Sequence, residues 1–211
     1  MKKGITAVFI AIILMTNLSG CGQKSGHDIY EGIYKRYTNL NSFYAEVEVT
    51  VLGDKLKSVY LGRQFYEAPD KFSFEVDSPQ EVSGSGYTLK GGKVLLRSGL
   101  GDQKVLDVSF PREKNTIFLC DFFEEYYKSE ETFIETAKSI YGETTVLSLY
   151  LPGKSEKRFM QSLKIDNKTY LPLELTTYDI NKNPVVIVRF GEFKGNCDID
   201  QRIFDSVGDK S

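Results

Sequence analysis

From position 42 onward the sequence alternates between apolar and polar residues, and this period of two limits most of the chain to sheet structure. Over 42–51 the apolar residues occupy every second position. Successive side chains of a strand point to opposite faces, so this stretch predicts a strand with one buried face. Gly91-Gly92 separates two short apolar runs, 87–90 and 93–97, as in a two-residue hairpin. Further strands are expected, among them four at about 144–151, 157–166, 171–180 and 184–194.

Two segments show helical spacing instead. The first is expected over about 28–40, where Ser25 and Asp28 can form a capping pair. The second is expected to open at Asp121, with Glu124 as its capping partner. Its apolar residues keep helical spacing to Ile140, and Gly142 is a natural stop.

The count is eight or nine antiparallel strands with two helices. No strand–helix–strand alternation is present, which argues against a doubly wound nucleotide-binding fold. We therefore predict an α+β fold, mainly β, in which a strongly curved antiparallel sheet forms a half-open barrel with helices packed on its concave face. A chain of 211 residues fits one such domain, which we assign to 28–211. A short apolar element, Ile203-Phe204, closes it.

The first 21 residues have the order of a bacterial lipoprotein signal. Lys2 and Lys3 precede an apolar run over 5–15, which is too short to span a bilayer of about 30 Å. Leu18-Ser19-Gly20-Cys21 then looks like a lipobox, in which the thiol receives a diacylglyceryl group. We expect a signal peptide over 1–20, lipid attachment at Cys21, a lipidated tether over 21–27 and a position on the outer face of the cytoplasmic membrane. The alternatives are an ordinary secretion signal with an accidental cysteine, or an uncleaved anchor.

Two cysteines remain after lipidation, Cys120 and Cys197. Outside the cytoplasm two such residues could form a disulfide. That bond requires their Cα atoms to approach to about 4.4–6.8 Å. The sequence leaves a disulfide and two buried free thiols both open.

The sequence contains few of the residues that catalytic sites require. His27 is the only histidine and falls in the tether, whereas a catalytic triad needs a rigidly held imidazole. Zinc sites need about three or four His, Cys or carboxylate ligands. The acidic pairs Glu124-Glu125 and Glu130-Glu131 are expected on the second helix as a solvated face. We therefore expect a non-enzymatic protein without catalytic residues, metal or cofactor.

The net charge and the aromatic content indicate which kind of binding function is expected. With 27 Lys+Arg against 29 Asp+Glu the formal net charge is −2, which argues against nucleic-acid binding. The 14 Phe and 13 Tyr favour a packed core, and some of them could line a cavity or a docking patch. The candidates on or beside strands are Tyr44, Tyr60, Tyr66, Tyr87, Tyr170 and Tyr178.

Several short motifs carry a resemblance to a known family. They are LNSFYAEV at 40–47, FYEAPDKFSFEV at 65–76, Gly91-Gly92-Lys93 and LPLEL at 171–175. Over about 28–205 the chain resembles the LolA/LolB/LppX superfamily of lipoprotein carriers. That resemblance implies a half-open antiparallel barrel whose concave side is plugged by helices, in agreement with the strand count.

More narrowly, the lipobox and the size of the chain are similar to those of clostridial spore germination lipoproteins of the GerS type. The resemblance implies a non-enzymatic partner of a CwlD-like N-acetylmuramoyl-L-alanine amidase, which licenses muramic-δ-lactam formation in the spore cortex. It places the protein between the forespore and mother-cell membranes. The alternatives are a lipid or lipoprotein carrier with an apolar cavity, and an envelope sensor. An adaptor should expose an apolar patch or a sheet edge, and the same edge could support a homodimer.

Overall fold

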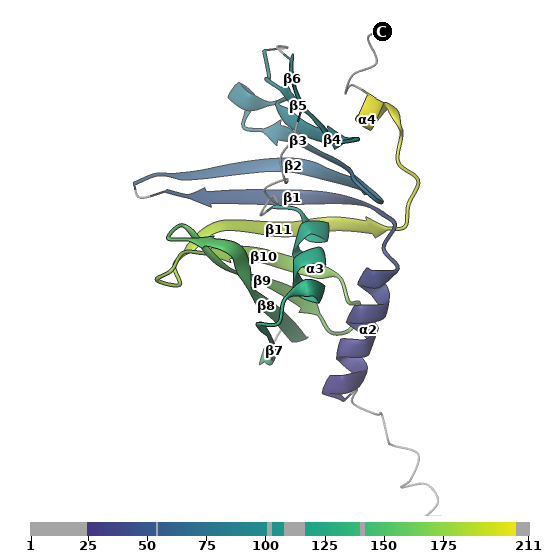
Figure 1. Cartoon of the computed structure of the whole chain (residues 1–211), viewed down its shortest axis with the longest axis vertical. Coiled ribbons are helices and arrows are strands. Elements are labelled where there is room, and N and C mark those ends of the chain that lie inside the picture. The colour runs from purple at the N-terminus through teal and green to yellow at the C-terminus, as the bar shows by residue number, and fades with distance from the viewer. Residues whose placement is uncertain (1–24, 54, 101–102, 108–116, 140–141, 206–211) are drawn as a thin grey trace, which may run out of the picture.

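One antiparallel sheet of eleven strands dominates the structure (Figure 1). The computed structural model describes residues 25–53, 55–100, 103–107, 117–139 and 142–205. The strands are β1 (Ser42–Leu52), β2 (Lys57–Glu67), β3 (Lys71–Ser78), β4 (Gly86–Lys90), β5 (Lys93–Arg97), β6 (Gln103–Asp107), β7 (Thr132–Ser139), β8 (Gly142–Ser155), β9 (Arg158–Asp166), β10 (Pro172–Tyr178) and β11 (Pro184–Gly195). Their order is β6-β5-β4-β3-β2-β1-β11-β10-β9-β8-β7, so the curved sheet stays open with edges at β6 and β7. The expected fold class is confirmed, although eight or nine strands was too low a count.

The apolar residues of the predicted alternation form the sheet side of the hydrophobic core. Val49 of β1 pairs with Val188, Val188 with Leu175, Leu175 with Leu163, and Leu163 with Leu147. Directly paired residues of antiparallel strands share a face, and all five side chains are buried. This face is the one that the helices cover.

Helix α2 (Gly26–Thr38) begins with a complete capping box. The Ser25 side chain accepts from the Asp28 backbone, and the Asp28 side chain accepts from the Ser25 backbone, as predicted. The helix starts slightly earlier than expected, so His27 lies in its first turn rather than in a tether. Ile29, Ile33 and Tyr37 face the core.

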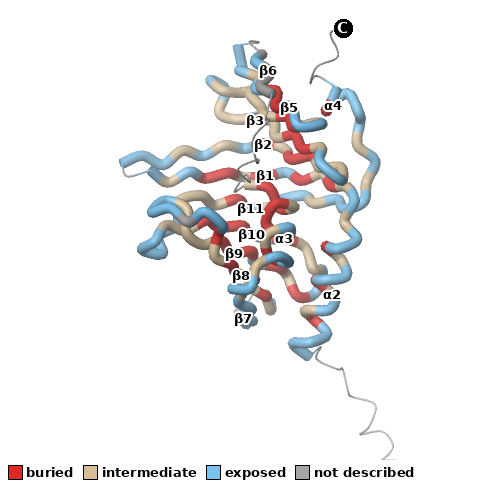
Figure 2. The backbone as a smooth tube through the Cα atoms, in the orientation of Figure 1, coloured by how far each residue is buried: buried red, intermediate tan, exposed pale blue. Residues whose placement is uncertain are grey.

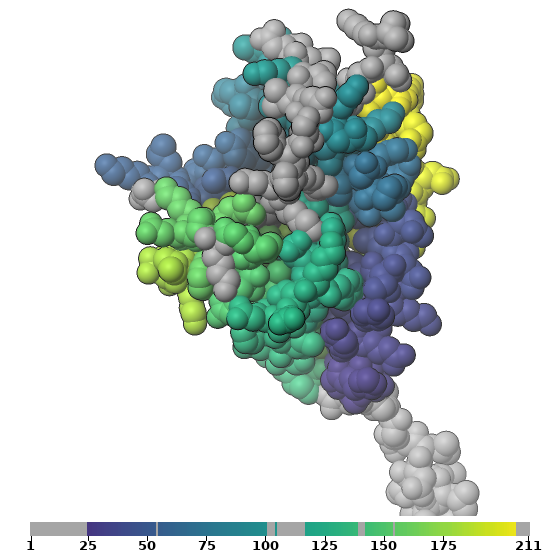
Figure 3. Space-filling view, in the orientation of Figure 1, coloured from purple at the N-terminus to yellow at the C-terminus, as the bar shows by residue number. Residues whose placement is uncertain are grey.

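Helix α3 (Leu119–Lys128) lies across the same face of the sheet, next to α2 (Figures 1 and 3). Leu119, Phe122, Phe123 and Tyr126 are buried against the strands. The burial map shows the consequence: buried backbone follows the middle of the sheet, while β7 is exposed (Figure 2).

The predicted second helix was wrong over its second half. α3 ends before Ser129, and residues 132–139 form β7, which pairs in continuous register with β8 from Thr132–Leu149 to Ser139–Gly142. The hydrogen bonds to β8 and the β-branched residues of β7 outweigh the helical spacing of the apolar residues. The predicted cap was also wrong, since the N-cap is Phe118 and has no side-chain capping bond.

Two smaller predictions are confirmed. Gly91 (φ 55°) and Gly92 (φ 73°) form the tight turn between β4 and β5, where positive φ values favour glycine. Helix α4 (Arg202–Asp205) buries Phe204, the expected closing element, and contacts β3 and β4.

Candidate functional site

The edge strand β7 presents apolar side chains to solvent. It closes the described sheet on one side and pairs with β8 alone. Phe133 is 48% exposed and Ile134 is 49% exposed, and as neighbours on a strand they point to opposite faces. A strand edge with exposed apolar residues is a template on which another chain can pair.

An aromatic groove lies next to β7 on the face of the sheet that is turned away from α2 and α3, here called the outer face. The Phe133 ring meets Tyr150 edge-on at 5.6 Å between centroids, and Tyr150 meets Phe159 at 5.2 Å. This outer groove has a volume of about 320 Å³. Its lining includes Phe133, Glu135, Val146, Tyr150, Met160, Tyr178 and Lys182. It can accept an apolar side chain of a partner between aromatic walls, with one acidic and one basic residue beside them.

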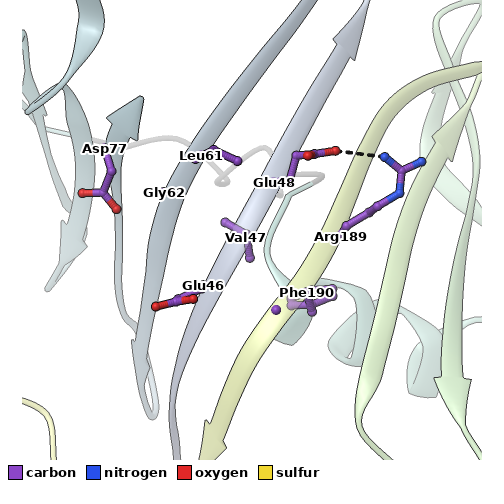
Figure 4. A pocket seen from close by; sticks show the side chains of 9 residues that line it. Glu46, Val47, Glu48, Leu61, Gly62, Asp77, Arg189 and Phe190 are labelled. Atoms are coloured by element: carbon purple, nitrogen blue, oxygen red, sulfur yellow. Dashed lines mark hydrogen bonds and ion pairs between the residues drawn. The ribbon is translucent and has the colours of Figure 1, made fainter. Parts of the chain in front are cut away.

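The centre of the outer face is different in character (Figure 4). A hollow of about 450 Å³ there is lined by carboxylates, among them Glu46, Glu48 and Asp77, and by Arg189. Arg189 pairs with Glu48 at 2.9 Å and with Glu174 at 3.1 Å. No group of three or more His, Cys, Asp and Glu residues able to hold a metal ion occurs among the described residues. The hollow is an ion-pair ladder on the sheet surface, and exposed pairs of this kind contribute about 0–1 kcal/mol each.

The concave side is filled by side chains of the two helices. Tyr37 of α2 stacks on Phe123 of α3 at 4.0 Å, and Phe122 stacks on Tyr126 at 5.7 Å. Burial raises the pKa of Tyr37 far above its usual range, while the charge of Arg36 opposes that rise. Burial also raises the pKa of Tyr126 to about 12, with the nearby Tyr30 adding to the effect. Both phenols are therefore neutral at physiological pH and act as core residues.

A second groove, the helix groove, opens at the rim of this core between α2, α3 and the β2–β3 turn. Its volume is about 490 Å³. Its lining is largely apolar or aromatic and includes Leu40, Tyr66, Pro69, Phe72, Cys120, Phe123 and Tyr127. A groove of this composition is suited to an acyl chain or another apolar ligand.

The six candidate tyrosines are dispersed over the molecule. Tyr60, Tyr66 and Tyr170 pack at the margin of the main core, and Tyr87 packs on a smaller cluster around Phe118. Tyr44 contacts Phe65 and its hydroxyl donates to Glu46. Only Tyr66 and Tyr178 line a groove described above.

Sequence reasoning missed the principal residues of the exposed edge, Phe133 and Ile134, because it placed them on a helix. A signal was present: Thr132, Ile134 and Thr136 are β-branched and alternate with period two. The same error placed Glu130 and Glu131 on a helix, although both follow its end.

The remaining predicted residues are placed as follows. Cys21, the signal peptide and most of the tether lie outside the described residues. Cys120 and Cys197 are both of intermediate burial and form no disulfide with one another, so of the two alternatives the structure has two thiols. Glu124 pairs with Lys128 at 2.7 Å on the exposed side of α3, as a solvated face should. In the described part of the chain, no helix is long and apolar enough to cross a membrane.

Comparison with known proteins gives this fold its context. A family model described as "Sporulation protein YdcC-like" matches residues 1–204. Sporulation protein YdcC of Bacillus subtilis (strain 168) is 19% identical over 205 residues, which are 97% of this chain but 60% of that protein. The chain therefore spans about 60% of the length of that relative.

Two solved structures share the fold. One is an uncharacterized conserved protein from Thermus thermophilus, with a TM-score of 0.55 and 13% identity over 89% of this chain and 96% of that one. The other is one chain in the structure of the CwlD amidase from Clostridioides difficile in complex with the GerS lipoprotein, with a TM-score of 0.51 and 24% identity over 82% of this chain and 96% of the matched chain. With the family model spanning nearly the whole sequence, the chain belongs to the YdcC-like family of sporulation proteins.

Proposed function

We propose that the protein is a membrane-anchored, non-enzymatic lipoprotein that binds a CwlD-like N-acetylmuramoyl-L-alanine amidase and licenses it for muramic-δ-lactam formation in the spore cortex. Lipid attached to Cys21 would hold it on the outer face of the cytoplasmic membrane, between the forespore and mother-cell membranes. Zinc and catalytic groups would belong to the amidase. Membership of a sporulation family and the fold shared with a GerS–CwlD complex support this proposal.

The observation that carries the proposal is the exposed β7 edge with its adjacent outer groove. A partner strand could pair with the free side of β7 while an apolar side chain enters the groove at Phe133. Main-chain hydrogen bonds would then supply affinity, and the aromatic walls would supply specificity. Side chains of the helices fill the helix-covered face of the sheet. Beside β8, the apolar surface that a partner can reach is therefore the β7 edge.

Two substitutions on β7 test this surface. We expect Phe133→Glu to lower amidase affinity by at least about 10-fold, since removing an aromatic anchor from an interface costs about 2 kcal/mol or more. Ile134→Lys, on the opposite face, shows whether the partner also uses the helix-covered side. Leu56→Glu is the matched control, because Leu56 is 78% exposed in the β1–β2 turn, away from β7. Affinity is measured by titrating residues 22–211 with the amidase, and activation by following amidase turnover.

Loss of binding in Leu56→Glu as well as in Phe133→Glu would point to a general folding defect and would remove support for the surface. Full binding by both β7 variants would overturn the proposed docking site. A stable dimer of the protein alone that Phe133→Glu or Ile134→Lys dissolves would assign the edge to self-association instead.

A second function is favoured by the helix groove. Its aromatic and apolar lining could hold an acyl chain, as a tethered lipid or lipoprotein receptor would require. Native mass spectrometry of the purified protein distinguishes the two roles. Bound acyl lipid that Tyr127→Glu removes supports the carrier, since Tyr127 lines the helix groove and is 38% exposed, and absence of lipid together with a stoichiometric amidase complex supports the adaptor.

A further inference from the structure

A pocket of about 480 Å³ lies beside the C-terminal half of α2, and all the charged residues that line it are basic. Its lining includes Gly32, Lys35, Arg36, Tyr170, Gly195 and Asn196. None of the described residues that line it is a carboxylate, in contrast to the carboxylate-lined hollow at the centre of the outer face. We call it the basic pocket.

Arg36 and Lys35 have no anionic partner there. Among the described residues neither forms an ion pair, whereas Arg63 and Arg189 are each paired with two carboxylates. The Nε of Arg36 is buried without a hydrogen-bond acceptor in that same part of the chain. A guanidinium carries five N–H donors and no acceptor, and a buried donor without a partner is costly. This Nε is closed to solvent and the Arg36 side chain also bonds the Tyr37 hydroxyl, so an oxyanion in the pocket would meet the terminal nitrogens of Arg36, of which Nη2 lies near Gly195.

Capping of the C-terminus of α2 does not by itself explain why Lys35 and Arg36 lie there. Basic residues often bond the last carbonyls of a helix and favour its dipole. Here other groups already bond those carbonyls: Thr38 Oγ1 donates to the Tyr34 oxygen and Asn39 Nδ2 donates to the Lys35 oxygen, both at 2.7 Å. These two carbonyls therefore do not need Lys35 or Arg36 as donors.

Two residues with unusual backbone conformation flank the pocket. Tyr170 (φ 56°) and Asn196 (φ 52°) both adopt the left-handed region, which is uncommon for residues other than glycine. Tyr37 Oη donates to the Tyr170 carbonyl at 2.9 Å, and Asn196 Oδ1 accepts from the Asn41 backbone at 2.8 Å. Strained positions held by such bonds cluster at ligand sites.

Two glycines complete the cavity. A Cβ on Gly32 would lie 2.4 Å from Cζ of Tyr170, so only glycine lets this ring pack against the helix. A Cβ on Gly195 would lie 3.9 Å from Nη2 of Arg36, an ordinary contact, and 3.0 Å from Cδ1 of Leu40, whose flexible end would have to shift slightly. Position 195 therefore lines the pocket beside Arg36 without a side chain of its own.

We propose that the basic pocket binds a phosphate group, with Arg36 as its principal ligand and Lys35 as the second positive charge. Two cations without a carboxylate match a tetrahedral oxyanion of about two negative charges, and guanidinium groups bind phosphate with paired N–H donors. This site lies apart from β7 and does not depend on the amidase proposal.

The test is a titration of the full chain in nonionic detergent with inorganic phosphate, at constant ionic strength maintained with chloride. We expect phosphate to bind and to raise the unfolding temperature by mass action. Arg36→Gln should weaken binding about 10- to 100-fold, as loss of a charge-assisted hydrogen bond does. Lys35→Gln should weaken it about 2- to 5-fold. Lys57→Gln, an exposed lysine on β2, is the matched control and should bind like the wild type.

Substitution at Gly195 provides a test that does not remove a basic residue. Gly195→Asp places a carboxylate beside Arg36 Nη2, so it should abolish phosphate binding while keeping the protein folded. Gly195→Ala adds the Cβ alone and should retain binding. Equal phosphate affinity in the wild type, Arg36→Gln and Gly195→Asp would overturn the proposal, as would a wild type that responds to phosphate no more than to chloride.

The phosphate could be free or could belong to a lipid headgroup. Titration with dihexanoyl phosphatidylglycerol below its micelle concentration distinguishes these sources. Tighter binding of this lipid than of inorganic phosphate, lost in Gly195→Asp, assigns the site to a headgroup. Tighter binding of inorganic phosphate assigns it to a free or monoester phosphate.

Discussion

Helix α3 and strand β7 follow one another in the chain, are both rich in apolar residues and have opposite environments. Phe122 on α3 is 1% exposed and stacks inside the core, whereas Phe133 on β7 is 48% exposed at the edge of the sheet. The apolar residues of α3 stabilise the fold. Those of β7 leave much of their surface in water, which fits the partner-binding surface that we propose for this edge.

The comparison also shows how one spacing pattern fits two structures. Ile134 and Ala137 are three positions apart and would lie on one face of a helix. In β7 they lie on opposite faces, because strand positions alternate. Pairing with β8 selects the strand over the helix, and no local pattern in the sequence encodes this pairing.

The largest expected effect is loss of stability on truncation within α3. Phe122→Ala should lower the free energy of unfolding by about 3–5 kcal/mol, since it leaves a cavity among Phe123, Tyr126 and the sheet. Denaturant unfolding measures this value. A loss below about 1 kcal/mol would mean that α3 is not part of the core.

A second contrast is the response to alkaline pH. Burial raises the pKa of Tyr126 to about 12, against about 10 in an unfolded chain. The folded state therefore holds this proton more tightly, so the stabilisation is complete below about pH 10 and is lost as pH rises toward 12. Tyr126→Phe should flatten this part of the stability curve, measured by urea unfolding between about pH 9 and 11.

Strand β7 contains no tyrosine, so Phe133→Ala should leave the alkaline slope unchanged. A slope that changes equally in Phe133→Ala and Tyr126→Phe would show that the alkaline transition does not report on the α3 environment.

The third effect is smaller. Phe133→Ala should lower the free energy of unfolding by about 0.5–1 kcal/mol, because much of this side chain stays in water in the folded state. The same denaturant series used for Phe122→Ala measures it. A loss of about 3 kcal/mol or more, as expected in a core, would remove the distinction between the two segments.

The smallest effect concerns one exposed ion pair in each segment. Lys128 pairs with Glu124 along α3, and Lys138 of β7 pairs with Glu143 of β8, both at 2.7 Å. Lys128→Ala and Lys138→Ala should each cost about 0.3–0.5 kcal/mol, and salt should screen both. A loss that persists in about 1 M salt would identify a packing role for the lysine stem instead.

Sequence reasoning reached most of the sheet because its evidence was local. The alternation along β1, the Gly91-Gly92 turn and the Ser25–Asp28 capping box each lie within a few residues and each has one structural solution. The candidate docking edge and the basic pocket could not be reached in this way. The edge depends on β8 pairing with β7, and the pocket joins Arg36 to Tyr170 and Gly195, which only the tertiary fold brings together.

The strand order has a consequence for the sequence in which the strands pair during folding. Of the ten strand pairings in the described part of the chain, nine join consecutive strands, and only that of β1 with β11 joins segments far apart in the sequence. Each meander can form by fast local zipping, while closing the seam between them is the slow, high-contact-order step. When the chain emerges N-terminus first, β1 has one side unpaired until β11 follows. Folding from the N-terminus thus leaves β1, the central strand of the finished sheet, as a temporary edge. The pairing of β1 with β11 forms last.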